Sequence, residues 1–240
     1  MADILYTYKN QVYANITNRC DCSCEFCIRT HKDQVGEAEN LWFKKEPTLE
    51  EIKAAMDAFD FTGYEELVYC GYGEPTCALE NLLASAAYVK EKYDIQVRLN
   101  TNGLANLYHK RNVVPELAKV VDNVSISLNA PNAEKYQKVT RPQFENAFPA
   151  LLEFATLAQE TFAHTQLSIV DVLPKEILKD ICEAVDVPVV AIGGIGKENM
   201  LELSGTKVDG AALVSAIFSA EDIESECRLL RKLSEEMVKA

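Results

Sequence analysis

The sequence has little of what marks a nucleic-acid-binding, membrane or secreted protein. Its 24 lysines and arginines stand against 37 aspartates and glutamates, a net charge of −13, whereas phosphate binding needs clustered cations. The longest apolar runs, such as 187–195, are too short to cross a bilayer. The first residues carry neither the basic nor the apolar part of a signal peptide. We therefore expect a cytoplasmic protein without a nucleic-acid surface or a membrane partner.

What the sequence does contain is a regular alternation of strand-like and helix-like segments. Its 240 residues, 48% hydrophobic and 25% charged, fit one globular α/β domain. The expected strands are 11–17, 66–71, 95–101, 123–129, 165–172, 188–192 and 210–215, after an edge strand at 4–8. The expected helices are 48–60, 79–93, 114–121, 144–160, 175–185, 198–203 and 220–238. Thr48 and Glu51 form a capping box at the start of the first of these helices.

This order predicts parallel strands joined by right-handed helical crossovers. Seven such units favour a partial or near-complete TIM-type (β/α) barrel with about seven parallel strands, and an open parallel sheet is the alternative. One face of several strands is polar: Ser125, Ser127 and Asn129 alternate with apolar residues. We expect helices to cover the apolar face and the polar face to line a cavity that holds a polar ligand.

Four of the eight cysteines lie between positions 20 and 27, and thiolates this close repel one another unless a metal neutralises them. Cys24-x-x-Cys27 is half of a zinc site, but the sequence has no second C-x-x-C. Cys20, Cys24 and Cys27 together offer three thiolates to an iron–sulfur cubane and leave one iron open. A redox C-x-x-C is a third alternative, and it gives Cys20 and Cys22 no role. The other cysteines are interpreted as buried small hydrophobes. They are Cys70, Cys77, Cys182 and Cys227.

The cysteine spacing resembles the CxxxCxxC motif of the radical SAM superfamily, with the usual aromatic, Phe26, before the last cysteine. Three further motifs follow in the superfamily's order, each at the end of an expected strand. They are GYGEPT at 71–76, NTNG at 100–103 and SISLN at 125–129, similar to the GGEP motif, the TNG motif and the ribose-contacting strand. The likeness covers about residues 1–172 and is greatest to the TatD-linked radical SAM branch.

This resemblance implies a set of cofactor contacts. Cys20, Cys24 and Cys27 would hold a 4Fe–4S cluster, and S-adenosylmethionine would bind its open iron. The remaining contacts to S-adenosylmethionine would come from Phe26, Gly71, Tyr72, Gly73, Glu74, Asn102, Ser125, Ser127 and Asn129. One electron from the cluster would then give a 5′-deoxyadenosyl radical. The resemblance identifies no catalytic residue that acts on the substrate.

The last quarter of the chain, about 179–237, resembles a different family, thiamine phosphate synthase. Segments 188–195 and 210–217 carry the match, and their strands are apolar on both faces. In that family the loops after these strands bind a phosphate, which by this match would contact Gly194, Val214 and Ser215. The pyrophosphate-binding front half of the synthase is absent, so we do not expect synthase activity.

Together these observations predict a radical SAM-type enzyme of unknown substrate. Residues 1–172 would form its radical SAM-like partial barrel, and 173–240 would complete the same barrel. An electron donor such as flavodoxin or ferredoxin is implied, along with a small-molecule or peptide substrate. The alternatives are a phosphate-binding barrel related to thiamine phosphate synthase and a non-enzymatic metal-binding protein that uses the cysteine cluster.

Overall fold

The computed structural model describes most of the chain. The described residues are 2–8, 11–30, 35–169, 175–184, 188–192, 195–213, 215–220 and 222–239. Contacts between residues divide the chain into two compact units, which we describe separately. Unit 1 comprises Met1–Ser127 and Thr140–Gln166, and unit 2 comprises Leu128–Val139 and Leu167–Ala240. The expected division at residue 172 follows the two resemblances rather than these contacts, and it stays a prediction.

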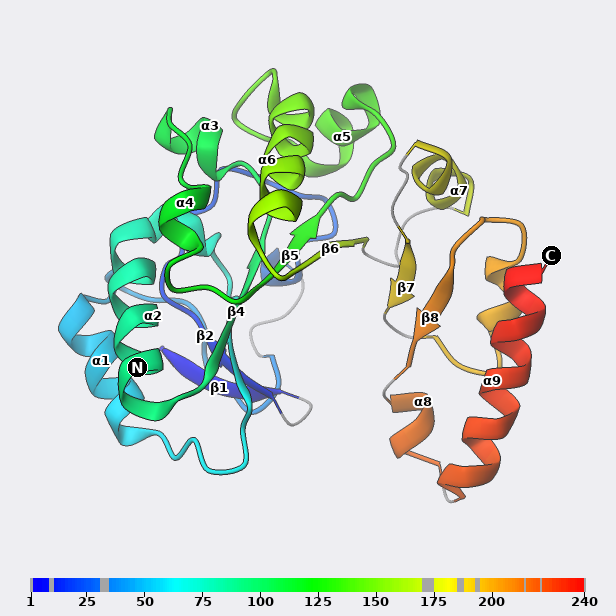
Figure 1. The fold of residues 1–240 in the computed structure, drawn as a ribbon, viewed down its shortest axis with the longest axis horizontal. Coiled ribbons are helices and arrows are strands. Elements are labelled where there is room, and N and C mark those ends of the chain that lie inside the picture. The colour runs from blue at the N-terminus through cyan, green and yellow to red at the C-terminus, as the bar shows by residue number, and fades with distance from the viewer. Residues whose placement is uncertain are drawn as a thin grey trace. The chain divides into compact units, whose positions relative to one another are not determined.

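A six-stranded sheet has its strands in sequence order from one edge to the other (Figure 1). The strands are β1 (Leu5–Tyr8), β2 (Gln11–Ala14), β3 (Glu66–Tyr69), β4 (Gln96–Thr101), β5 (Asn123–Ser127) and β6 (His164–Ser168). β1 pairs antiparallel with β2, and the pairs β2–β3, β3–β4 and β4–β5 are parallel. This order confirms the predicted α/β fold, including the antiparallel edge strand.

The helices between these strands begin with α1 (Leu49–Ala58), which carries the predicted capping box. The Glu51 N–H donates to Thr48 Oγ1 at 3.2 Å, and the Thr48 N–H donates to Glu51 Oε2 at 2.7 Å. The other helices up to β6 are η1 (Ile28–Thr30), η2 (Pro75–Ala78), α2 (Leu79–Tyr93), α3 (Ala105–His109), α4 (Val114–Leu117), α5 (Ala133–Thr140) and α6 (Ala147–Thr161). In Figure 1, α1 and α2 lie side by side, and these two helices contact each other.

The helix-covered face of the sheet forms the core of unit 1. Val97 and Leu99 of β4 are fully buried, as are Val124 and Ile126 of β5. Gly103 lies between Ile126 and Leu151 of α6, because a Cβ added there would meet both side chains at 3.0–3.2 Å. The expectation that helices cover the apolar face is therefore confirmed. The opposite face carries the polar side chains.

Unit 2 contains a separate two-stranded parallel sheet, β7 (Val190–Ile192) and β8 (Gly210–Ala212). Its helices are α7 (Lys175–Ala184), η3 (Met200–Leu203), α8 (Ser215–Phe218) and α9 (Ile223–Lys239). Ala191 is buried, whereas Val190 and Ile192 are 41% and 49% exposed. Packing of both faces of this strand, which the apolar pattern of 188–192 indicates, stays a prediction. Among the described strands, no hydrogen-bonded pair links the two sheets, so they do not form a closed barrel.

Several short helices were not predicted from the sequence, among them α3 and α5. α5 follows Asn132, whose side-chain oxygen accepts the Lys135 N–H at 3.0 Å. α3 ends at His109 and is capped by Lys110, which adopts a left-handed backbone with φ of 54°. A helix of five to eight residues shows too few turns for an apolar period to stand out. The Asn132 cap was the one local signal for α5.

Candidate functional site

The cysteine-rich loop follows β2 in unit 1. Cys22 is buried, and its backbone forms an isolated antiparallel β-bridge with Pro142. Cys20, Cys24 and Cys27 are half-buried free thiols. The Cys27 N–H donates to the Cys24 carbonyl at 3.2 Å, which closes a turn between the last two predicted ligands. Within the described residues, no three His, Cys, Asp or Glu side chains converge on a point suited to a single metal ion. The loop thus keeps its thiols near one another without gathering them into a site for a single ion.

Arg29 fastens this loop to its neighbours. Its guanidinium donates to the Cys22 carbonyl at 3.2 Å, the Tyr72 carbonyl at 3.4 Å and the Asn18 carbonyl at 3.5 Å. The guanidinium also lies 6.0 Å from the ring centre of Trp42, within the range of a cation–π contact. One cation thus joins the cysteine loop to the loop after β3. Its charge opposes the burial that raises the pKa of the Cys20 thiol, and it adds to the hydrogen bond from Cys22 that lowers the pKa of the Cys24 thiol.

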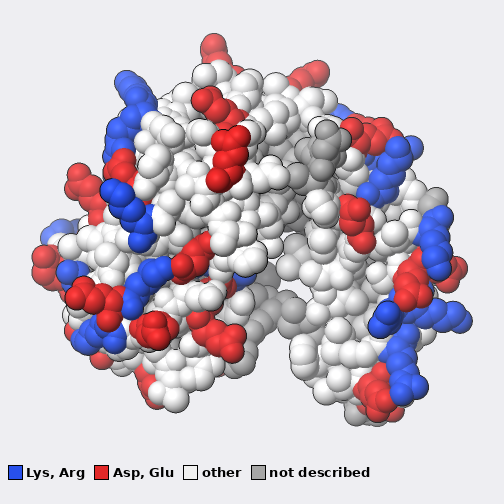
Figure 2. Space-filling model, viewed as in Figure 1, with Lys and Arg blue, Asp and Glu red and all other residues white. Residues whose placement is uncertain are grey.

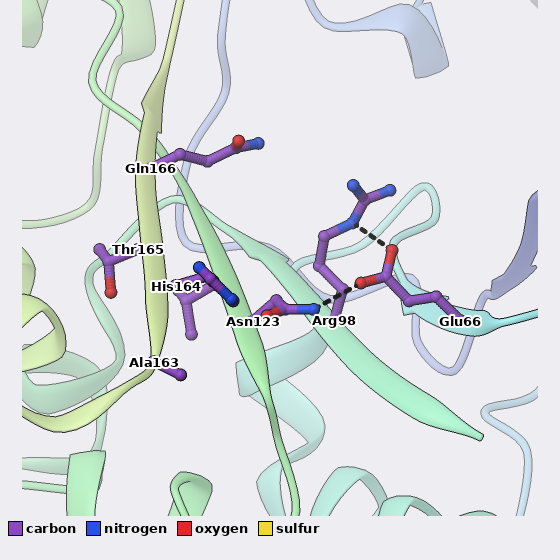
Figure 3. Close-up of a pocket in the computed structure, with 8 residues that line it drawn as sticks. Glu66, Arg98, Asn123, Ala163, His164, Thr165 and Gln166 are labelled. Atoms are coloured by element: carbon purple, nitrogen blue, oxygen red, sulfur yellow. Dashed lines mark hydrogen bonds and ion pairs between the residues drawn. The ribbon is translucent and has the colours of Figure 1, made fainter. Parts of the chain in front are cut away.

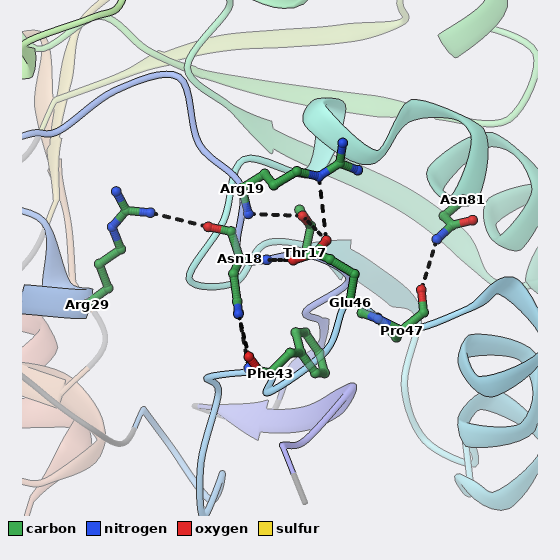
Figure 4. A network of polar contacts seen from close by, with 8 residues as sticks. All are labelled: Thr17, Asn18, Arg19, Arg29, Phe43, Glu46, Pro47 and Asn81. Carbon is green, nitrogen blue, oxygen red and sulfur yellow. Dashed lines mark hydrogen bonds and ion pairs between the residues drawn. The ribbon is translucent and has the colours of Figure 1, made fainter.

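A second set of polar contacts holds the start of the cysteine loop against residues 43–46 (Figure 4). Thr17 Oγ1 donates to Glu46 Oε2 at 2.5 Å, and the Asn18 N–H donates to Glu46 Oε1 at 2.9 Å. The Asn18 amide exchanges two hydrogen bonds with the Phe43 backbone, at 2.7 and 3.1 Å. The polar side chain of Thr17 therefore serves the protein's own loop. Thr17 therefore does not line an open cavity on the polar face of the sheet.

Close packing against residues 15–19 requires the two glycines after β3. A Cβ on Gly71 would lie 2.2 Å from Asn15 Oδ1, and one on Gly73 would lie 2.2 Å from the Thr17 carbonyl oxygen. Both positions therefore exclude any larger side chain. Tyr72, which replaces the first glycine of the family's motif, is buried, and its ring meets Trp42 edge-on at 5.3 Å. This tyrosine packs the loop against the segment around Trp42.

Glu74 is a buried carboxylate that ties the end of β3 to the end of β4. Its Oε1 accepts from the Thr76 N–H and hydroxyl at 3.1 and 2.7 Å and from Thr101 Oγ1 at 2.8 Å. Its Oε2 accepts the Asn102 N–H at 2.8 Å. Burial and the nearby charge of Asp21 raise the pKa of Glu74 to about 7 despite these donors. The loop itself is held to the cysteine segment by the Glu74 N–H, which donates to the Arg19 carbonyl at 2.8 Å.

Asn102, a predicted cofactor contact, connects β4 to the cysteine loop. Its Nδ2 donates to Asp21 Oδ1 at 2.5 Å and lies 3.6 Å from Cys22 Sγ. Asp21 is buried, and desolvation raises the pKa of its carboxyl above the usual value. Sequence reasoning missed Asp21, Arg29 and Thr101 as parts of this site. The position of Asp21 and Arg29 in and just after the cysteine motif was the available signal.

The thiols of this loop differ in acidity. Burial and the Glu74 charge raise the pKa of Cys20 to about 12. A hydrogen bond joins the Cys22 and Cys24 side chains; it raises the pKa of the Cys22 thiol and lowers the pKa of the Cys24 thiol. Cys24, a predicted ligand, is therefore the thiol held closer to its thiolate form, and Cys22 is its hydrogen-bond donor.

The remaining predicted contacts are distributed over both units. Phe26 is half-buried. Ser125 is buried and accepts from Gln166 Nε2 at 3.1 Å, and Ser127 is half-buried at the end of β5. Asn129 belongs to unit 2, where it is buried with a φ of 55°. The structure thus brings the cysteine loop, residues 71–74 and Asn102 together.

The predicted phosphate contacts are not tested by the structure. Gly194 and Val214 lie outside the described residues, and Ser215 is described only as the first residue of the four-residue helix α8. Of the cysteines interpreted as packing residues, Cys77 is buried, and Cys70, Cys182 and Cys227 are half-buried. Within the described residues, no helix is both long and apolar enough to cross a membrane.

The fold and the position of the cysteine loop define an α/β protein with a partial (β/α) barrel. A radical SAM methyltransferase from Sphaerobacter thermophilus has a similar fold, with a TM-score of 0.56 at 15% identity over 95% of this chain and 66% of that chain. SuiB of Streptococcus suis, solved with its precursor peptide, gives 0.55 at 16% identity over 95% of this chain and 46% of that one. Both likenesses show the fold alone.

The family model of the radical SAM superfamily matches residues 14–187. This chain belongs to that superfamily and is an enzyme of its class, whose members generally use an iron–sulfur cluster and S-adenosylmethionine. The comparisons give no support to the TatD-linked branch that the sequence suggested.

The second resemblance is also confirmed. A model of thiamine monophosphate synthase matches residues 161–217. The thiamine-phosphate synthase of Pyrococcus furiosus is 48% identical over 67 residues, which is 28% of this chain and 32% of that protein. That of Pyrococcus abyssi is 46% identical over 69 residues, which is 29% of this chain and 33% of that protein. The chain thus spans about a third of the length of these relatives. The two family models overlap from 161 to 187, so they do not place the junction.

Proposed function

We propose that this enzyme holds a 4Fe–4S cluster through Cys20, Cys24 and Cys27 and binds S-adenosylmethionine beside it. When bound, the two groups would together supply a 5′-deoxyadenosyl radical through one-electron reduction. The observation that carries the proposal is the placement of three free thiols in one loop that is fastened to the Gly71–Glu74 segment. A cubane spreads its ligands over several irons, so the lack of a convergent single-ion site is compatible with this donor set.

The contacts around the loop support these ligand roles. Arg29 brings a positive charge to a site where three thiolates would gather, and its three carbonyl contacts hold the loop in place. The hydrogen bond from Cys22 favours the thiolate of Cys24. Cys22 is therefore proposed as a donor to the ligand thiolate and not as a ligand.

The S-adenosylmethionine contacts are proposed from the same geometry. Glu74 already accepts four hydrogen bonds from the chain, so its role is to hold the 71–74 loop, while the backbone of that loop would receive the methionine amino group. The resemblance implies five further contacts to S-adenosylmethionine, which we also propose. They are Phe26, Asn102, Ser125, Ser127 and Asn129. Phosphate binding by Gly194, Val214 and Ser215 stays a prediction.

The proposed partners follow from the chemistry. An electron donor such as flavodoxin or ferredoxin would reduce the cluster, and the substrate would be a small molecule or a peptide. We further propose a cytoplasmic location and no nucleic-acid or membrane partner, which the net charge of −13 supports.

Anaerobic reconstitution with iron and sulfide tests the cluster assignment. We expect about four irons per chain and a broad absorption near ~400 nm. Cys24→Ala should lose the cluster, whereas the matched control Cys22→Ala should keep it. Full iron content in both variants would contradict the ligand assignment. Stoichiometric zinc without iron uptake would favour the non-enzymatic metal-binding alternative.

A second measurement separates cluster binding from catalysis. The reconstituted protein is reduced with dithionite in the presence of S-adenosylmethionine, and 5′-deoxyadenosine is quantified by chromatography. We expect its formation to depend on both reductant and Cys24. A protein that holds its cluster but never releases 5′-deoxyadenosine would refute the radical chemistry and leave the ligand assignment intact.

A further inference from the structure

A polar cavity of about 480 Å³ lies within unit 1, on the sheet face opposite the helix-covered core. Its size falls within the range of small-molecule sites. The lining residues come from the first halves of β3 to β6 and the residue before β6 (Figure 3). They are Glu66, Arg98, Asn123, Val124, Ala163, His164, Thr165 and Gln166. None of these residues is a proposed cofactor contact, although Gln166 Nε2 donates to Ser125 Oγ, a proposed contact, at 3.1 Å.

The cavity is separated from the cysteine loop along the strands. Arg98 is the third residue of β4, whereas Asn102, which contacts the cysteine loop, comes directly after that strand. Four residues of strand correspond to roughly 13 Å. The cavity therefore lies toward the amino-terminal ends of the parallel strands, and the proposed cofactor contacts lie at their carboxyl ends.

Arg98 is the cation of this cavity, and its donors are only partly used. Its side chain is 22% exposed and forms an ion pair with Glu66, with 3.2 Å between Nε and Oε2. Nη2 donates to Gln11 Oε1 at 3.2 Å. The buried Nε has no aligned hydrogen bond. A guanidinium carries five N–H donors in a planar fork that suits a carboxylate.

Glu66 supplies the opposite charge. Its side chain is 18% exposed, and Asn123 Nδ2 donates to its Oε1 at 2.8 Å. Gln166 and His164 lie on the side of β6 that faces Arg98 and Glu66 in Figure 3. Gln166 uses its Nε2 on Ser125, so its carbonyl oxygen is available as a further acceptor. The cavity thus offers a cation, an anion and neutral polar groups side by side.

Charge balance decides what such a cavity binds. Arg98 and Glu66 neutralise each other, so a simple anion or cation would leave one net charge beside a partly buried ion pair, at a cost in desolvation. A zwitterion adds no net charge and provides a partner for each member of the pair. We propose that this cavity binds a free amino acid, with its carboxylate on Arg98 and its ammonium group on Glu66.

This proposal does not depend on the cluster, so it is tested on the full chain without iron or reductant. Each of the twenty standard amino acids is screened at millimolar concentration by thermal shift, and the best is measured by calorimetry. We expect saturable binding of at least one amino acid. Its amide and its N-acetyl form should each bind about ten-fold more weakly or worse, because each lacks one of the two charges.

Variants then locate the site. Glu66→Gln keeps an acceptor for Asn123 and removes only the negative charge. Arg98→Lys keeps the positive charge and removes the planar guanidinium with its paired N–H donors. We expect each to weaken binding about ten-fold or more. The matched controls Glu116→Gln and Arg111→Lys change an exposed ion pair elsewhere in unit 1 and should leave binding unchanged. No saturable binding by any amino acid would overturn the proposal. The proposal would also be overturned if both cavity variants bound the amino acid as well as the wild type does. It would be overturned too if the amide and the N-acetyl form bound as well as the free amino acid.

Discussion

Glu74 shows at the scale of one residue how the site combines burial with hydrogen bonding. Four donors from Thr76, Thr101 and Asn102 surround its carboxyl group, yet burial and Asp21 raise its pKa to about 7. The folded protein therefore holds a proton on Glu74 at a pH where the unfolded chain, with an ordinary value near 4.5, has released it. Glu74, which belongs to a cofactor motif in the sequence, thus makes the folding free energy depend on pH.

The sign of this coupling gives a prediction for the protein without iron. Because the folded pKa is raised, the stability from Glu74 is fully present below pH 4.5 and is lost as the pH rises through 7. The free energy of unfolding should fall by about 3 kcal/mol from this group over that window. Urea denaturation at several pH values measures it, with Glu116→Gln as an exposed control. A Glu74→Gln variant with the same pH slope as the wild type would contradict the assignment.

At the scale of elements, α1 is a helix whose start was predicted from two residues. Thr48 and Glu51 exchange hydrogen bonds between side chain and backbone, which satisfies two N–H groups at the start of the helix. Ile52 and Met56 then bury one face. Local capping and an apolar period agree here, and the helix forms at its predicted position.

Removal of this cap gives a prediction at the same scale. Thr48→Ala should lower the free energy of unfolding by about 1 kcal/mol, because the Glu51 N–H loses its acceptor at 3.2 Å. Urea denaturation measures the change. Thr156→Ala, an exposed position within α6, makes the same chemical change away from a helix start and should cost less. An equal loss in both variants would show that the cap contributes nothing specific.

At the scale of the whole molecule, acidic and basic side chains are interspersed, as the visible faces in Figure 2 show. On α9, Arg228 pairs with Glu224 and Arg231 with Glu235, so these cations are already matched by carboxylates. With a net charge of −13, little positive potential is left to attract phosphates.

The charge predicts the behaviour of the full chain toward nucleic acids. In a gel-shift assay at physiological salt, neither duplex DNA nor single-stranded RNA should change mobility when the protein is added at micromolar concentration. A basic nucleic-acid-binding domain serves as the positive control. A shift that weakens as salt rises would contradict this prediction, because that dependence is the signature of phosphate contacts.

Sequence reasoning succeeded where a signal is local. The spacing of Cys20, Cys24 and Cys27, the Thr48 capping box and the alternation in β4 and β5 each depend on neighbours a few residues apart. It failed for α3 and α5, which are too short for a period. It also missed Arg29, because its contact with the Tyr72 carbonyl joins segments that are distant in the sequence.

The sequence by itself therefore determined the family, the cysteine motif and the order of strands and helices, since these are written in short-range patterns. Only the tertiary structure decided that Gly71 and Gly73 pack closely against residues 15–19 and that the Glu74 carboxyl group accepts four hydrogen bonds from the chain itself. It alone also placed Arg98 beside Glu66 in a cavity. The physical reason is that hydrogen bonding and desolvation depend on which distant segments meet, and no local pattern encodes those meetings.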